Sequence, residues 1–441
     1  MKKLVCLLSV SLLAFSLLSY SQKQEVTTTA LQFVEMLTKG DFSSATEDFD
    51  GTMKKVLPPT KLQTIWTSLI TQVGPFKNQN GIRMQKYREY DIIFVTCKFE
   101  RAYIDVKVVF NAEGKISGLF FLPGKPPAYK SPEYVDPNAF VERKVMVGSG
   151  KWALDGTLTI PKGNAPFPAV VLVHGSGPND RDETIGPNKP FRDLAWGLAS
   201  KGIIVLRYEK RTKEHAAKLI PMKDKITVKE ETIDDAIAAV SLLHHTREVD
   251  PEKIFVLGHS LGGMLIPRIG MLDPDITGFI IMAGPTRPLE DLIFEQTKYI
   301  FSLDGITSEK EKKQLELLKK QVAMVKSPRL SVSTPSKELP LDIPAAYWLD
   351  LRGYEPAKLA ERLNRPMLIL QGGRDYQVTV KDFQGWKDAL SSWKNVEFRY
   401  YPNLNHLFIA GKRKSTPAEY MKIGHVAKCV IDDIANWIKR Q

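Results

Sequence analysis

The chain has few cysteines, and their spacing excludes several kinds of site. Only three occur among 441 residues, and no two are separated by the short intervals of a metal-binding or redox motif. We therefore expect neither a metal ion nor a cofactor. Cys97 and Cys429 fall in different expected domains, so we predict that each is a small buried hydrophobic residue and not half of a disulfide.

Long apolar runs are also scarce, and the one that is present lies at the start. It extends from residue 4 to residue 18, follows Lys2 and Lys3, and precedes small residues at alternate positions, Ser19 and Ser21. This pattern predicts a secretory signal peptide over residues 1–21. No other stretch is long and apolar enough to span a bilayer, so we expect an exported protein, periplasmic or extracellular, without stable membrane insertion after signal cleavage.

Positive charge is not concentrated in any one region. The formal net charge is +12, and the lysines are spread along the chain. The densest cluster, residues 310–320, alternates Lys and Glu with leucines at helical spacing, which is typical of a solvated amphipathic helix. No nucleic-acid-binding motif accompanies the charge, so we expect no nucleic acid as a partner.

The first region, residues 24–123, carries the pattern of a small α+β domain. Two segments with helical apolar spacing precede three strand-like runs. They are residues 30–37 and 62–73, then 90–99, 102–110 and 116–122. This order, with its turn-containing ending Phe110–Ile116, resembles the cone-shaped NTF2-like domain of the DUF3887 type. Prolines are frequent over residues 124–140, which predicts a linker.

Residues 141–441 alternate strands and helices. An opening antiparallel hairpin and six further strands, several of them continuous apolar runs, predict an eight-stranded, mostly parallel α/β sheet covered on both faces. The predicted strands are 142–147, 153–160, 169–173, 203–206, 254–257, 279–282, 367–370 and 397–400. The predicted helices between them are 191–200, 232–244, 264–269 and 380–393, with a terminal helix over 417–438.

One interval, residues 285–365, is far longer than a strand-to-helix connection needs. Helical spacing over 289–301 and 308–324 predicts a helical cap inserted over the sheet edge. Tyr347, Trp348 and Tyr354 in its later part are candidates to line a substrate pocket, and an equally good interpretation is that they form the core of the cap.

The most informative motif is Gly-His-Ser-Leu-Gly-Gly at 258–263. An apolar run precedes it and a helix-compatible segment follows, so Ser260 is predicted to sit on a sharp strand-to-helix turn with its hydroxyl exposed. Gly258 and Gly262 flank it because side chains there would collide with the neighbouring strand and helix. This arrangement resembles the nucleophile elbow of the α/β-hydrolase superfamily.

A serine hydroxyl needs a base, and the base needs an orienting acid. In the fold that the motif resembles, the partners follow in the order Ser, Asp or Glu, His. Asp375 follows the strand 367–370, and His406 follows the strand 397–400, so both meet this order. His425, in the expected terminal helix, is the main rival base; Asp382 and Asp350 are less favoured acids.

Attack by serine creates an oxyanion, which needs two N–H donors. The expected donors are the backbone N–H groups of Leu261 and Ser176, with Gly177 as an alternative to Ser176. The charged segments that follow the strands, 179–183 and 207–211, resemble those of dienelactone hydrolases and of S9 and S33 peptidases. Their charged members are interpreted first as structural ion pairs and second as substrate contacts: Arg181, Asp182, Arg207 and Lys210.

These residues together predict a serine esterase that forms an acyl-enzyme on Ser260. A peptidase, amidase or thioesterase of the same fold is the alternative within the class. A non-catalytic envelope or glycan-binding protein on a hydrolase scaffold is the alternative outside it. The expected partner is a small-molecule or glycan-linked acyl ester; the sequence assigns neither the acyl group nor the oligomeric state.

Overall fold

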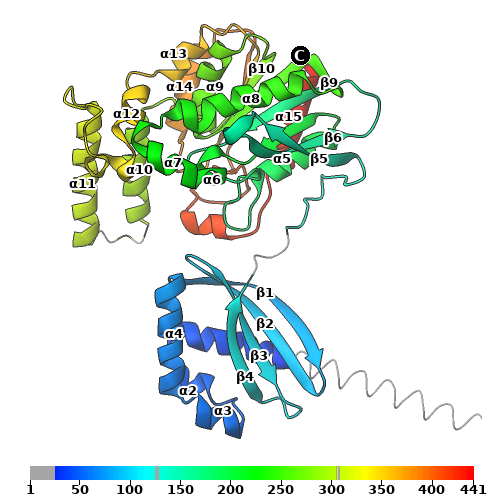
Figure 1. Ribbon diagram of the computed structural model, residues 1–441, viewed down its shortest axis with the longest axis vertical. Helices are drawn as coiled ribbons and strands as arrows, with labels where there is room; N and C mark the ends of the chain where they lie inside the picture. Colours follow the sequence, from blue (N-terminus) through cyan, green and yellow to red (C-terminus); the bar gives the residue numbers. More distant parts are fainter. Residues whose placement is uncertain (1–24, 125–128, 304, 306–307) are drawn as a thin grey trace, which may run out of the picture. The chain divides into compact units, whose positions relative to one another are not determined.

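A computed structural model describes residues 25–124, 129–303, 305 and 308–441. The predicted signal peptide, residues 1–21, lies outside the described residues. The chain divides into two compact units, Met1–Ala128 and Tyr129–Gln441 (Figure 1). Among the described residues, no helix combines the length and apolar character needed to cross a membrane.

The first unit is a four-stranded antiparallel sheet with helices packed on one face (Figure 1). Its strands pair in chain order and are β1 (Phe76–Tyr87), β2 (Tyr90–Phe99), β3 (Tyr103–Phe110) and β4 (Ile116–Pro123). Its helices are residues 25–39, α2 (Phe42–Ala45), α3 (Gly51–Val56) and α4 (Pro59–Val73). Alternate residues of β2, from Ile93 to Phe99, face the helices and are buried, which the two-residue strand period requires.

The second unit is built on an eight-stranded sheet with the strand order β12-β11-β10-β9-β7-β8-β6-β5. β5 (Phe140–Val147) and β6 (Leu154–Pro161) are antiparallel, and β6 also pairs antiparallel with β8. The other strands run parallel. They are β7 (Phe167–Val173), β8 (Ile204–Tyr208), β9 (Val249–His259), β10 (Gly278–Met282), β11 (Met367–Gly372) and β12 (Val396–Tyr401).

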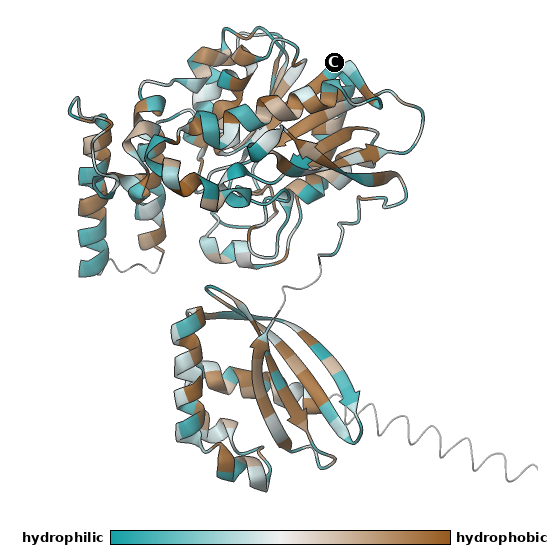
Figure 2. Ribbon diagram, in the orientation of Figure 1, coloured by the Kyte–Doolittle hydropathy of each residue, from teal (hydrophilic) through white to brown (hydrophobic). Residues whose placement is uncertain are grey.

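Helices bury both faces of this sheet, which is why its central strands are apolar on both sides. Figure 2 shows the strands largely brown inside a shell of mixed helices. One face packs against α5 (Pro190–Ala199) and α15 (Lys428–Arg440). The other packs against α8 (Asp234–His244), α9 (Leu261–Leu272) and α14 (Val380–Leu390).

A helical cap lies between β10 and β11, as predicted. Its long helices are α10 (Leu289–Phe301) and α11 (Glu309–Lys326), and α12 (Ala345–Leu351) and α13 (Pro356–Ala360) lead back to the sheet. Short helices fill the remaining loops: η1 (Gly150–Trp152), α6 (Arg211–Glu214), α7 (Ala216–Leu219), η2 (Ile220–Lys225), η3 (Lys229–Ile233), η4 (Ser336–Glu338), η5 (Pro340–Asp342) and η6 (Pro417–Met421). The fold class is therefore the predicted one, an α/β-hydrolase sheet with a cap, preceded in the sequence by a small α+β domain.

Two local predictions are wrong, and one strand was not predicted. β1 was missed because its sequence is polar and the strand lies at a sheet edge, where none of its residues is buried. The terminal helix begins at Lys428 and not near residue 417, so His425 lies in the preceding loop. Cys429 is exposed, whereas Cys97 is buried in the first unit, and both are free thiols.

The later residues of the expected linker contact the second unit. Tyr129 and Tyr134 both belong to the second unit and donate their hydroxyls to it. Tyr134 bonds to the Val426 carbonyl at 2.8 Å, and Tyr129 bonds to the Asp193 carboxylate. The stretch from residue 129 is thus held against the second unit.

Candidate active site

Ser260 sits on a strained turn between β9 and α9. Its φ and ψ are 54° and −118°, a conformation that costs energy for a residue with a side chain. Close packing explains the flanking glycines: a Cβ at Gly258 would lie 2.3 Å from the Gly262 carbonyl oxygen, and one at Gly262 would lie 2.3 Å from the Val173 oxygen. The turn therefore has the geometry of a nucleophile elbow.

Asp375 and His406 meet at the carboxyl edge of the sheet. Asp375 follows β11 and His406 follows β12, so parallel strand ends bring their loops together. His406 Nδ1 lies 2.6 Å from Asp375 Oδ2, and both side chains are buried. The backbone N–H groups of Gln377 and Val378 donate to Asp375 Oδ1 at 2.7 and 3.0 Å, which fixes the carboxylate in place.

The other candidate bases and acids have different partners. His425 Nδ1 lies 3.1 Å from the buried carboxylate of Asp193 in α5. Asp382 is fully buried and bonds to Arg287 at 2.8 Å, and Asp350 pairs with Arg268. None of these three lines the cavity that Ser260 lines.

The Ser260 hydroxyl makes no hydrogen bond within the described residues. Such contacts are often long in ligand-free enzymes and shorten when substrate binds. The main chain around it is well anchored, because Ser260 N–H donates to the Met282 oxygen at 2.9 Å.

The loop after β7 lies directly beside the nucleophile. A Cβ at Gly175 would be 3.1 Å from Ser260 Cβ. In the described part of the chain, the N–H groups of Ser176 and Leu261 donate to no protein acceptor. Free N–H groups beside a nucleophile can stabilise a developing oxyanion. The structure thus brings both predicted donors to the predicted nucleophile.

A second histidine–carboxylate pair lies beneath this loop, and sequence analysis did not assign it a role. His259 Nδ1 lies 2.8 Å from Glu183 Oε2, an ion-pair contact whose angle is not that of a hydrogen bond. His259 Nε2 donates to the His406 carbonyl at 2.9 Å, and Gly175 N–H donates to Glu183 Oε1 at 2.7 Å. The pair therefore ties the loop of the base to the loop of the expected oxyanion donor.

Within this pair, the pKa of His259 is raised and the pKa of Glu183 is lowered. Burial acts to lower the pKa of His259, but the Glu183 carboxylate, the His406 carbonyl and Asp375 together raise it. Burial acts to raise the pKa of Glu183, but His259, His174 and the Gly175 N–H together lower it. His174, in contrast, has its pKa lowered to about 4 by burial, so it is a neutral ring that donates from Nε2 to the Asp180 carbonyl.

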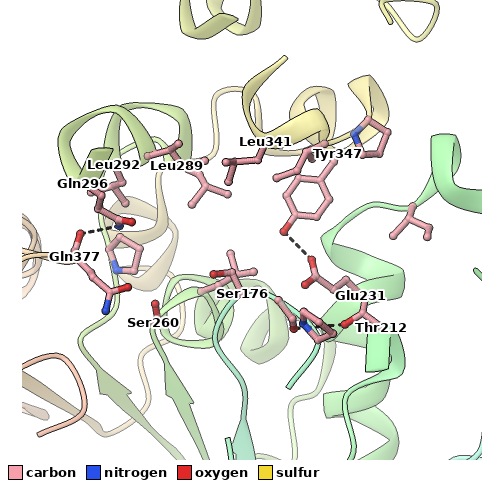
Figure 3. Close-up of a pocket in the computed structure, with 18 of the residues that line it drawn as sticks. Ser176, Thr212, Glu231, Ser260, Leu289, Leu292, Gln296, Leu341, Tyr347 and Gln377 are labelled. Carbon is pink, nitrogen blue, oxygen red and sulfur yellow. Dashed lines mark hydrogen bonds between the residues drawn. The ribbon is translucent and has the colours of Figure 1, made fainter. Parts of the chain in front are cut away.

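A cavity of 480 Å³ opens above Ser260, between the sheet edge and the cap (Figure 3). This is within the range of small-molecule sites. Figure 3 shows one side of the cavity formed by the cap residues Leu289, Leu292, Leu341 and Tyr347, with Ser260 and Ser176 on the opposite side. The lining is mainly apolar.

The three predicted pocket aromatics have different locations. Tyr347 lines the cavity, and its hydroxyl donates to Glu231 Oε2 at 2.7 Å (Figure 3). Trp348 does not line it: its ring packs in the core of the cap, and its Nε1–H donates to the Ile343 carbonyl. Tyr354 does not line it either, and its hydroxyl donates to the Met264 carbonyl. The pocket prediction therefore fails for Trp348 and Tyr354.

The charged residues of the loops form ion pairs, as interpreted from sequence. Arg181 pairs with Glu209 at 2.7 Å, and Arg207 is buried between Asp182 and Glu142. Glu231, which lines the cavity from η3, was not predicted from the sequence, because nothing in its local sequence distinguishes it from a surface glutamate.

Comparison with known proteins is consistent with this geometry. Residues 165–412, more than half of the chain, match the family described as "Serine aminopeptidase, S33". Residues 30–119 match a family described as a protein of unknown function, DUF3887. Esterase EstD of Thermotoga maritima is 46% identical over 411 residues, which cover 93% of this chain and 94% of that protein.

Solved structures show more distant similarity. Est1E from Butyrivibrio proteoclasticus has 14% sequence identity and a TM-score of 0.43, covering 68% of this chain and 99% of that one. An esterase from the archaeon Pyrobaculum calidifontis has 15% identity and a TM-score of 0.43, covering 68% and 85%.

Proposed function

This chain belongs to the family described as "Serine aminopeptidase, S33", and we propose that it is a carboxylic-ester hydrolase acting through Ser260. The observation that carries the proposal is the hydrogen-bonded Asp375–His406 pair at the sheet edge where the Ser260 elbow opens into an apolar cavity. The chemistry then follows from the roles of these groups.

In the acylation step, Ser260 Oγ attacks the ester carbonyl carbon. His406 accepts the serine proton on Nε2, while Asp375 holds the ring through Nδ1 and stabilises the positive charge. The carbonyl electron pair moves onto oxygen, where the N–H groups of Ser176 and Leu261 donate to it. The intermediate collapses, His406 protonates the leaving alcohol, and an acyl-enzyme remains.

In the deacylation step, water replaces the alcohol. His406 takes a proton from water, and the resulting hydroxide attacks the acyl carbon. A second oxyanion forms at the same two N–H groups, and its collapse returns the proton to Ser260 and releases the acid. Neither step needs a group beyond these residues, the ester and water.

The cavity favours an ester over a peptide with a free amino terminus. An aminopeptidase needs an available carboxylate to hold the substrate ammonium. Among the described residues that line the cavity, the one carboxylate is Glu231, and it is already bonded to Lys210 Nζ and the Tyr347 hydroxyl. The remaining lining, largely leucine, isoleucine and proline, suits an apolar acyl chain.

The proposal includes export to the periplasm or the cell exterior. The basic start and apolar stretch of residues 1–18 support it. Export also favours an ester outside the cytoplasm over an acyl-CoA thioester.

A matched set of substrates tests the proposed reaction. We expect p-nitrophenyl butyrate and hexanoate to be hydrolysed with a burst of p-nitrophenol, and leucine p-nitroanilide to be hydrolysed at least about 100-fold more slowly in kcat/KM. Acetylated and feruloylated glycans extend the panel. Faster cleavage of the anilide than of the esters would replace the esterase proposal with the aminopeptidase one.

A further inference from the structure

Lys210 is a buried lysine beside the oxyanion loop that the proposed reaction steps do not use. Its side chain is 2% exposed and carries a charge into the protein interior. Nζ donates to the Gly175 carbonyl at 2.7 Å and to Glu231 Oε1 at 2.6 Å. A charge buried at such cost calls for a specific partner, and here one of the two partners is a main-chain carbonyl.

That carbonyl belongs to the same peptide group as the expected oxyanion donor. The Gly175 C=O and the Ser176 N–H share one planar trans peptide, so they point in opposite directions. An ammonium that fixes the carbonyl on one side therefore fixes the N–H on the other. It also withdraws electron density from the peptide, which makes the N–H a stronger donor.

Further contacts define the loop on both sides of this peptide. Asn179 Nδ2 donates to the Gly175 oxygen at 3.2 Å and to the Ser176 oxygen at 3.1 Å. Glu183 accepts the Gly175 N–H, so the preceding peptide group is held by a carboxylate. Lys210 N–H in turn donates to the Asn179 carbonyl at 3.1 Å. Lys210 supplies the one cation in this set of contacts.

Resting on the proposed function, we propose that Lys210 is a positioning residue that aims the Ser176 N–H at the oxyanion. The assignment extends to the cap, because Glu231 binds Lys210 through Oε1 and the Tyr347 hydroxyl through Oε2. Tyr347 and Glu231 both line the substrate cavity (Figure 3). The orientation of the donor peptide is thus linked, through two side chains, to the wall that the acyl chain contacts.

The test replaces Lys210 with methionine, which keeps an unbranched side chain one atom shorter and removes the charge. Lys189→Met is the matched control, because Lys189 Nζ pairs with Asp182 at 3.0 Å on the same loop and does not contact Gly175. Asp182 keeps two arginine partners in this variant. We expect Lys210→Met to lose about 100-fold in kcat on p-nitrophenyl butyrate, the size of effect seen when one oxyanion donor is lost. KM should change by less than about threefold, and Lys189→Met should behave as the wild type.

A trifluoromethyl ketone separates positioning from general damage. Ser260 Oγ adds to its carbonyl carbon, the proton passes to His406, and the oxygen becomes an oxyanion that needs the same two donors. The inhibition constant of the ketone should rise in parallel with the loss of kcat, whereas that of a product acid should not. A lower kcat with unchanged ketone affinity would overturn the assignment, as would an unchanged kcat.

Two variants keep the test decisive if Lys210→Met folds poorly. In the double variant Lys210→Met, Glu231→Gln, no charge is left unpaired, and it should show the same loss of kcat and of ketone affinity. Tyr347→Phe should lower kcat and the affinity for the ketone, each by less than Lys210→Met does. Tyr354→Phe, which loses a 2.6 Å hydrogen bond to the Met264 carbonyl, should leave kcat and the affinity for the ketone unchanged. Equal effects of the two tyrosine variants would remove the link to the cap.

Failure of this inference is distinct from failure of the proposed function. A fluorophosphonate that labels wild-type Ser260, combined with full activity of Lys210→Met, refutes the role of Lys210 alone. Absence of both labelling and ester hydrolysis in the wild type refutes the proposed function and this inference with it.

Discussion

The floor of the cavity and its cap are built on different physical principles. The floor consists of loops at strand ends, and buried charges hold those loops: Glu183 with His259, and Lys210 with Glu231. The helices of the cap contact one another mainly through apolar side chains, and the ion pair that joins α10 to α11, Lys326 with Asp291, is exposed. Directional contacts fix atoms to fractions of an ångström, whereas apolar contacts mainly fix a volume. Chemistry therefore depends on the floor, and substrate size on the cap.

The largest effect is expected from removing the nucleophile on the floor. Ser260→Ala should lower kcat by at least about 10⁴-fold, because the remaining groups only bind and polarise the ester. Ser302→Ala, an exposed serine at the end of α10, is the control and should keep wild-type kinetics. Substantial activity left in Ser260→Ala would show that the floor does not act through this residue.

Breaking the buried Glu183–His259 pair beneath the floor should lower the free energy of unfolding by the amount typical of a buried ion pair. Glu183→Gln leaves His259 without its countercharge and the Gly175 N–H with a weaker acceptor. We expect the free energy of unfolding to fall by about 3–5 kcal/mol, measured by urea denaturation at neutral pH. A loss below about 1 kcal/mol, the scale of an exposed pair, would show that buried charges do not hold the floor more strongly than exposed pairs hold the cap.

The same pair should give stability a defined pH window. The raised pKa of His259 means that its contribution is complete below about pH 6.5 and is lost as pH rises through the raised value. The lowered pKa of Glu183 means that its contribution is complete above about pH 4.3 and is lost as pH falls through the lowered value. Urea unfolding measured from well below about pH 4.3 to well above about pH 6.5 should show the free energy of unfolding falling at both ends in the wild type, and both falls should be smaller in the double variant Glu183→Gln, His259→Gln.

A change in the cap should alter selectivity more than chemistry. Leu289→Trp adds volume to the cavity wall, so we expect kcat/KM for p-nitrophenyl octanoate to fall about tenfold and that for the acetate to change by less than about threefold. Leu303→Trp, on an exposed leucine outside the cavity lining, provides the control. Equal losses on both esters would place Leu289 in the chemistry instead of in substrate selection.

The smallest effect is expected from an exposed ion pair of the cap. Lys326 Nζ lies 2.5 Å from Asp291, with both side chains more than a third exposed. Lys326→Met should change the free energy of unfolding by less than about 1 kcal/mol. A loss comparable to that of Glu183→Gln would show that charge also holds the cap together.

The same contrast explains how much could be predicted from the sequence. Apolar runs and glycines carry their own signal, so β2 and α10 are found residue for residue, and the Ser260 elbow is recognised from its flanks. The polar edge strand β1 lacks that signal because its pairing with β2 comes from the main chain.

The candidate site follows the same division. Asp375 and His406 were predicted because the order of strands places them, and the structure brings them within hydrogen-bonding distance. Glu183 and Glu231 were not predicted, because their roles arise from partners that are distant in the sequence. Glu183 contacts His259, 76 residues later, and Glu231 contacts Tyr347, 116 residues later. Trp348 was misplaced because sequence spacing does not tell which side of the short helix α12 faces the cavity.

Reaction with a fluorophosphonate followed by peptide mass spectrometry tests the central claim most directly. In the folded wild-type protein we predict one modified serine, Ser260, with loss of ester hydrolysis in proportion to labelling, and no reaction after denaturation. His406→Ala should label far more slowly because the hydroxyl then lacks its base. Full ester hydrolysis by a protein in which Ser260 is unlabelled, or labelling of another serine in proportion to the loss of activity, would contradict the account.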